Sequence, residues 1–277
     1  MTTTKTATKR ARKTVALPPY VYPLDPKTNV VCGFDEAGRG PLMGDVVAAC
    51  VVLDHDHMIE GLNDSKKLSE KKRDALAPII KAQAKAWGIG RASPQEIDQL
   101  NIIGATFLAM RRAYDEMCAN FKVQVNLALV DGNLVPPTLP CYSEAVVKGD
   151  AQVAEIAAAS ILAKTTRDAD LYALDQQYPQ YQFGQHKGYP TAAHLALIQE
   201  LPLLPCYRTS YGPVKKLIAA RSAPAQVASH QTSAAPTTSA PTALGQAAPG
   251  KVAPGKAASQ SVDPTYYTLI EDPDWQR

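Results

Sequence analysis

The sequence has 277 residues, of which 45% are hydrophobic and 20% charged, and its formal net charge is +3. This composition is typical of a globular protein with a sizeable core, and no apolar run reaches the ~18–20 residues of a membrane helix, which excludes an integral membrane protein. The five cysteines are scattered singly, which argues against a disulfide scaffold or a cysteine-rich zinc site. With no signal-peptide pattern at the N-terminus, the sequence predicts a cytoplasmic protein with no membrane partner.

The excess positive charge is confined to the N-terminus. Residues 1–14 carry five basic side chains and no acid, whereas 15–221 and 222–277 each sum to −1. We predict that 1–14 is a disordered basic arm and that 15–221 is one folded domain. The arm is suited to adding non-specific phosphate affinity. It fits an idle solvated tail equally well and a mitochondrial presequence less well.

The central segment alternates between strand and helix patterns. In chain order we predict strands over 29–35 and 45–53, a helix over 69–85, a strand over 86–90, a helix start at 93–96, a helix over 104–120, strands over 125–130 and 144–148, a helix over 153–177 and a helix after Pro190. The helix start at Ser93 has a Ser cap, a Pro at the first position and a Glu three residues after the cap. This order of elements predicts an α/β fold with a sheet flanked by helices.

The end of the chain differs in composition. Residues 222–262 are rich in Ala, Pro, Ser, Thr and Gln and lack acidic and aromatic residues. They cannot bury enough apolar surface to offset chain ordering, so 222–277 is predicted to be a disordered, low-complexity tail. Residues 263–277 form an acidic-aromatic end. This end is either a motif for an unidentified partner or a tail that docks on its own domain or does nothing.

Carboxylates follow several of the predicted strands. Asp35 and Glu36 end the first strand, Asp131 ends the central strand, and Asp150 ends the short strand before the long helix. Open α/β sheets place their sites at such strand ends. Clustered carboxylates repel one another unless a cation joins them, and their hard oxygens suit Mg²⁺ or Mn²⁺. Taken singly, these acids also fit solvated loop residues, a turn residue and a helix cap.

The sequence resembles the ribonuclease HII family in seven motifs that occur in order between about residues 29 and 217. The motifs are Gly33–Leu42 (GFDEAGRGPL), Asn63–Ser69 (NDSKKLS), Asp131–Asn133 (DGN), Lys148–Asp150 (KGD), Ala157–Lys164 (AAASILAK), His186–Thr191 (HKGYPT) and Arg208–Val214 (RTSYGPV). This resemblance implies a ribonuclease H-like mixed sheet flanked by helices. It also implies an endoribonuclease that hydrolyses the RNA strand of RNA–DNA hybrids and nicks duplex DNA 5′ of embedded ribonucleotides, leaving 3′-hydroxyl and 5′-phosphate ends.

The resemblance assigns the catalytic, metal-binding role to four acids, which hold two Mg²⁺ or Mn²⁺ ions during catalysis. These are Asp35, Glu36, Asp131 and Asp150. Asp168 is a rival to Asp150, but 18 residues of helix would place it up to ~27 Å away. We therefore interpret Asp168, beside Arg167, as a structural charge partner. His186 and His194 lack metal-ligand spacing with any cysteine, and we interpret both as structural or peripheral.

The resemblance also implies which residues bind the substrate. Backbone groups of Gly38, Arg39 and Gly40 would read the 2′-OH, the group that separates RNA from DNA, and Tyr189 would pack on the deoxyribose that follows the ribonucleotide. Lys66 and Lys67 resemble phosphate contacts. The alternatives are a plain tight turn, a partly buried tyrosine before a proline, and a solvated lysine pair.

Three positions depart from the commonest family form: Met43, Asp45 and Tyr211, the last replacing a usual Phe. Asp45 would add negative charge near the site and alter metal affinity or backbone approach. Arg39 and the absence of an extra N-terminal domain distinguish the sequence from ribonuclease HIII. The resemblance implies a monomer. A non-catalytic hybrid-binding protein is the alternative from another functional class, and the presence of all four acids argues against it.

Overall fold

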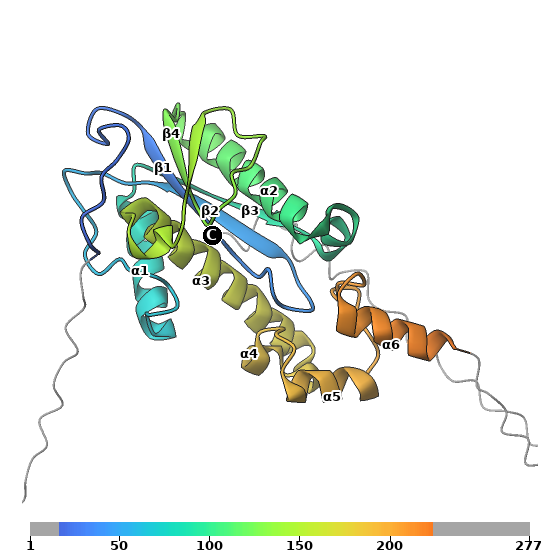
Figure 1. The fold of residues 1–277 in the computed structure, drawn as a ribbon. Coiled ribbons are helices and arrows are strands. Elements are labelled where there is room, and N and C mark those ends of the chain that lie inside the picture. Colours follow the sequence, from blue (N-terminus) through green and yellow to red (C-terminus); the bar gives the residue numbers. More distant parts are fainter. Residues whose placement is uncertain (1–16, 224–277) are drawn as a thin grey trace, which may run out of the picture. The chain divides into compact units, whose positions relative to one another are not determined.

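The computed structural model describes residues 17–223, so the predicted arm and the acidic-aromatic end lie outside the described residues. Five strands form one mixed sheet in the order β3-β2-β1-β4-β5 (Figure 1). Their bounds are β1 Val31–Ala37, β2 Val46–Val52, β3 Ala86–Ala92, β4 Leu127–Asp131 and β5 Tyr142–Val146. β2 is antiparallel to β1 and β3, whereas β4 is parallel to β1 and β5. All five predicted strands are therefore present, with β5 starting two residues before its predicted position.

The helices are α1 Glu70–Gln83, α2 Pro94–Phe121, α3 Ala154–Gln177, α4 Phe183–His186, α5 Ala192–Glu200 and α6 Gly212–Ser222, with short 3₁₀ turns η1 Gly149–Ala151 and η2 Pro179–Tyr181. The capping box at Ser93 is confirmed, since its side chain accepts from the Glu96 amide and the Glu96 carboxylate accepts from the Ser93 amide. Within residues 17–223 no helix is both long and apolar enough to cross a membrane.

The two helices predicted over 93–120 form one element with a kink. Asn101 has φ 58° and ψ 171° and interrupts α2. Its side-chain oxygen accepts hydrogen bonds from the amides of Ile103 and Gly104 at 2.9 and 3.2 Å. Asn101 therefore caps the second half of α2, because a helix start leaves amides without partners.

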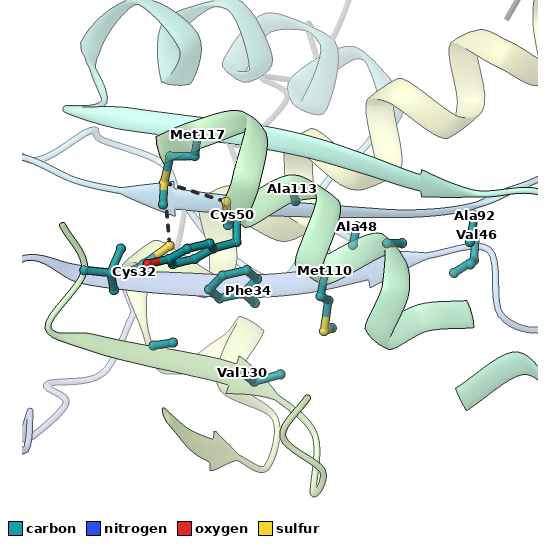
Figure 2. Packing of buried hydrophobic residues seen from close by; sticks show 14 of the residues in the cluster. Cys32, Phe34, Val46, Ala48, Cys50, Ala92, Met110, Ala113, Met117 and Val130 are labelled. Atoms are coloured by element: carbon teal, nitrogen blue, oxygen red, sulfur yellow. Dashed lines mark hydrogen bonds between the residues drawn. The ribbon is translucent and has the colours of Figure 1, made fainter. Parts of the chain in front are cut away.

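The sheet separates two apolar layers. Figure 1 shows α2 on one side of the sheet and α1 with α3 on the other. Alternate residues of β1 point to opposite faces, so Cys32 and Phe34 pack in the layer under α2. Figure 2 shows Met117 of α2 in this layer, where its sulfur lies 3.9 Å from Cys32 Sγ and 3.7 Å from Cys50 Sγ. β2 is buried along its whole length, as its continuous apolar run predicts.

Candidate active site

Three acids from separate chain segments meet at one edge of the sheet. Asp35 lies in β1 and Asp131 ends β4, and because these strands are parallel neighbours their carboxyl ends lie side by side. Asp150 completes the group, and one carboxylate oxygen from each of the three lies within 4.8 Å of the others. The sequence placed Asp150 at a strand end, which is wrong in detail: β5 ends at Val146 and Asp150 lies in η1.

The charges of these acids oppose one another. Burial raises the pKa of Asp35 well above its usual range, and the charges of Glu36 and Asp131 raise it further. Burial also raises the pKa of Asp150, with added contributions from Asp131 and Asp64. For both acids, burial and the neighbouring carboxylates outweigh the hydrogen bonds and the Lys66 charge that favour the ionised form. A buried group of hard carboxylate oxygens fits a divalent cation such as Mg²⁺ or Mn²⁺.

Glu36 lies beside the three-acid group rather than within it. Burial raises its pKa, and Arg39 opposes that effect through an ion pair with Nη1–Oε1 3.1 Å. Glu36 lines two hollows, one together with Asp131 and the other together with Lys66. The structure thus gathers three of the four predicted acids tightly and holds the fourth against Arg39.

The loop before α1 contributes groups that the sequence did not single out. Asp64 makes a side-chain hydrogen bond with Asp150. Ser65 Oγ lies 2.8 Å from Ser160 Oγ, and Ser160 in turn hydrogen-bonds Asp35. Asp64 and Ser65 belong to the NDSKKLS motif next to Lys66, and Ser160 belongs to the AAASILAK motif; membership of these motifs was the available sequence signal.

The two predicted lysines have different surroundings. Lys66 Nζ lies 3.7 Å from Asp150 Oδ2 and lines the larger hollow. Lys67 pairs with Asp64 at 3.8 Å, its side chain is 62% exposed, and it does not line that hollow. Of the two lysines, only Lys66 therefore lies next to the three-acid group.

The larger hollow, of about 270 Å³, lies beside the Gly38-Arg39-Gly40 turn and is lined by several cationic side chains. Its lining residues are Glu36, Ala37, Gly38, Arg39, Gly40, Ser65, Lys66, Ser160, Lys164, Arg167 and Tyr189. Ser160, Lys164 and Arg167 lie on one face of α3, because residues four and three apart are neighbours on a helix. This spacing could have identified Lys164 and Arg167 from the sequence, but neither side chain was predicted as a site residue.

The two glycines of the turn have different packing. Gly38 has φ +98°, and a Cβ atom there would lie 2.2 Å from Nε of Arg167, so both backbone and packing require glycine. A Cβ atom on Gly40 would lie 3.4 Å from Cε1 of Tyr189, an ordinary contact. The fold itself therefore does not explain a glycine at position 40.

Asp168 has the structural role predicted for it, with different partners. It binds Lys164 Nζ at 2.6 Å and Arg73 Nη2 at 3.6 Å. Arg73 also donates to the backbone carbonyls of Ser65 and Leu68 at 3.0 and 2.9 Å. Asp168 thereby supports the loop that carries Lys66.

Residues 32–212 match the family model of ribonuclease HII. The chain belongs to the ribonuclease HII family. A ribonuclease HII from Vibrio campbellii is 56% identical over 210 residues, which cover 76% of this chain and 96% of the relative. As a member of this family, the protein is a metal-dependent ribonuclease.

Solved structures share the fold. The crystal structure of the ribonuclease H2 from Pyrococcus horikoshii OT3 matches with a TM-score of 0.57 at 25% identity, covering 70% of this chain and 99% of that one. The crystal structure of Bst-RNase HIII in complex with Mn²⁺ matches with a TM-score of 0.57 at 17% identity, covering 70% of each chain. The predicted ribonuclease H-like mixed sheet flanked by helices is confirmed.

In this member of the ribonuclease HII family, two stacked histidines support the segment that carries Tyr189. The rings of His186 and His194 lie 3.8 Å apart and nearly parallel. His194 donates from Nδ1 to the Tyr189 carbonyl at 2.9 Å, and its Nε2 accepts from the Tyr207 hydroxyl at 2.9 Å. His186 Nδ1 accepts from the Gly188 amide at 3.1 Å. Of the two predicted alternatives, structural or peripheral, these contacts support the structural one, and this arrangement requires neutral rings.

Acidification is expected to destabilise this segment. Burial lowers the pKa of His194 from 6.5 to about 4 and also lowers the pKa of His186. At these two histidines the folded state therefore binds fewer protons than the unfolded state between these values, so their contribution to the free energy of unfolding falls as the pH falls from about 6.5 through about 4. The raised pKa values of Asp35 and Asp45 act in the opposite direction, so the histidine contribution is measured by denaturant unfolding as the difference between the wild type and His194→Gln. That difference should change by about 1–3 kcal/mol across this range, and a difference independent of pH would contradict the assignment.

Two of the positions that depart from the common family form have structural partners. Met43 is buried, and a Cβ atom on Gly188 would lie 2.9 Å from its sulfur. Burial raises the pKa of Asp45 to about 6 despite the charges of Arg91, Arg208 and Arg167. Asp45 thus lies within a cluster of arginines, whose buried charge it partly balances.

Proposed function

We propose that the protein hydrolyses the RNA strand of RNA–DNA hybrids and nicks duplex DNA on the 5′ side of an embedded ribonucleotide, leaving 3′-hydroxyl and 5′-phosphate ends. The observation that carries this proposal is the three-acid group beside a cationic hollow and a glycine turn. Acids alone would suit cleavage of any phosphodiester. The turn adds a surface on which the sugar can be read.

Asp35, Asp131 and Asp150, with Glu36, are proposed to hold two Mg²⁺ or Mn²⁺ ions. Their oxygens have the hardness that these ions prefer, and the Mn²⁺ complex of Bst-RNase HIII, which shares the fold, is in keeping with this choice. When bound, such ions activate a water molecule and stabilise the leaving oxygen of an in-line displacement. Ser160 holds the Asp35 carboxylate in place by a hydrogen bond.

The hollow is proposed to hold the cleaved strand. Lys66, Lys164 and Arg167 supply positive charge along its wall, which suits successive phosphates. The Arg39 guanidinium, whose side chain is 50% exposed, is placed to bind a further phosphate. Lys67, farther out, would add only screened attraction.

The sugar is proposed to be read where the turn and Tyr189 line the hollow. Gly38, Arg39 and Gly40 present backbone groups to the ribose, and the missing Cβ of Gly40 leaves room for a close approach. Tyr189, which is 45% exposed, offers a ring on which the next deoxyribose would pack. An added 2′-OH would crowd that contact.

The test is a nicking assay on a duplex with one ribonucleotide, run with titrations of Mg²⁺ and Mn²⁺. The proposal expects a single cut 5′ of the ribonucleotide, with 3′-hydroxyl and 5′-phosphate ends, and no product in a chelator. An all-DNA duplex of the same sequence is the control. Equal cutting of both duplexes would refute the sugar selectivity, and binding without cleavage under either ion would favour a non-catalytic hybrid-binding protein.

A further inference from the structure

A buried arginine holds the carbonyl groups of the glycine turn. Arg208 is fully buried, and its guanidinium donates to four backbone carbonyls between Gly38 and Gly44. The distances are 2.6 Å to Gly38, 3.1 Å to Arg39, 2.8 Å to Pro41, and 2.7 and 2.9 Å to Gly44. A planar fork with five N–H groups is the side chain that can satisfy several carbonyls at once.

Backbone hydrogen bonds fix the rest of this turn. The Leu42 amide donates to the Gly188 carbonyl at 2.8 Å, and the Leu42 carbonyl accepts from the Arg208 amide at 2.9 Å. The Gly44 amide donates to the Cys206 carbonyl at 2.8 Å. Reorienting a peptide of the turn would leave buried polar groups unpaired, which is costly.

Tyr211 adds a second support at the centre of the turn. Its hydroxyl donates to the Arg39 carbonyl at 2.6 Å and accepts from Nη1 of Arg208 at 3.1 Å. The Arg208 guanidinium carbon lies 5.1 Å from the centre of the Tyr211 ring. A phenylalanine at this position would keep the ring and lose both hydrogen bonds.

These bonds determine where two amide groups point. In a planar trans peptide the C=O and the following N–H point in opposite directions. Because Arg208 and Tyr211 hold the carbonyls of Gly38 and Arg39 on their side, the amides of Arg39 and Gly40 point away from them. Within residues 17–223 neither amide donates a backbone hydrogen bond outside the sheet and helices, and both residues line the cationic hollow.

We propose that Arg208 and Tyr211 are positioning residues that aim the amides of Arg39 and Gly40 at the ribose, and so determine how well the enzyme separates ribose from deoxyribose. This inference rests on the proposed function of the turn. Neither residue touches the substrate; they act through the peptides that do.

The experiment compares binding of two duplexes, one with a single ribonucleotide and one of all DNA, in Ca²⁺ without Mg²⁺ or Mn²⁺. The ratio of the two dissociation constants measures the discrimination. Tyr211→Phe should reduce this ratio about three- to tenfold, the size expected for one net hydrogen bond, with little change in affinity for the all-DNA duplex. Hydrogen exchange of the peptide that contains Arg39 and Gly40 should become faster.

Tyr181→Phe is the matched control. It removes a hydroxyl that also donates to a backbone carbonyl at 2.6 Å, that of Pro202, outside the turn. It should lower the melting temperature to a similar extent and leave the ratio unchanged. Arg208→Lys should reduce the ratio of dissociation constants further, provided that this variant folds. If Arg208→Lys does not fold, the result for Tyr211→Phe alone tests the inference. An unchanged ratio in Tyr211→Phe, with the wild type discriminating, overturns the inference; a wild-type ratio of one instead refutes the proposed function.

Discussion

Asp35→Asn is expected to abolish cleavage of a ribonucleotide-containing duplex, with a rate loss of at least about 10³-fold. Asp35 is the most buried of the three clustered acids, with 4% of its surface exposed. Its carboxylate would share the charge of the bound ions. Asparagine has nearly the same shape, so its oxygen still accepts the Glu36 amide, which Asp35 Oδ1 now accepts at 2.7 Å. The loss would therefore reflect charge rather than folding.

The melting temperature distinguishes a loss of catalytic charge in Asp35→Asn from a loss of folding. Burial and then the charges of Glu36 and Asp131 raise the pKa of Asp35, so the ionised form is disfavoured in the metal-free fold. In a chelator at pH 7 the variant should melt at the same temperature as the wild type or higher, and Mn²⁺ should no longer raise that temperature. Asp115→Asn, on the exposed face of α2 where Asp115 pairs with Arg111, is the control. More than a tenth of wild-type activity in Asp35→Asn would contradict the assignment.

Gly40→Ala is expected to lower the cleavage efficiency at a single ribonucleotide by on the order of 100-fold, the scale associated with a misplacement of about 1 Å. The free protein accommodates the methyl group, since it would lie 3.4 Å from the Tyr189 ring. The same methyl group would stand where the sugar is proposed to approach. Steady-state kinetics on the nicking substrate measure the effect, while the melting temperature should change by a few degrees at most.

Two other glycines give the controls for Gly40→Ala. Gly212→Ala makes the same change at a site with no atom within 4 Å and should leave the kinetics unchanged. Gly38→Ala should instead destabilise the protein, because its φ is +98° and the methyl group would meet Arg167. If Gly40→Ala lost stability as Gly38→Ala does, the explanation by substrate approach would fail.

Much of the architecture could be predicted from the sequence because its signals are local. The apolar run of β2 and the capping box at Ser93 depend on neighbours in the chain and are confirmed. The kink at Asn101 could not be predicted, because it joins two correctly predicted segments through one positive φ. Helix α6 was not predicted, since its pattern is only weakly amphipathic.

The site was harder to predict where partners are distant in the sequence. Asp35 and Asp131 converge because β1 pairs in parallel with β4, and Asp150 joins them because it follows β5, the parallel neighbour of β4 on its other side. The contact of Asp64 with Asp150, and the support of the turn by Arg208, join segments that no local pattern relates. The turn at Gly38 was visible in the sequence, whereas the residues that hold its shape were visible only in three dimensions.

The support of the turn by Arg208 also orders the events of biosynthesis. The clustered acids are all translated by residue 150, but the arginine that shapes the turn follows 58 residues later, since it is number 208. Domains are made from the N-terminus onward, so a nascent chain contains the acids before it contains the segment that orients the turn. On the proposed function, selectivity for the sugar would therefore require synthesis to proceed past Arg208 and Tyr211, whereas every clustered acid is already in the chain by residue 150.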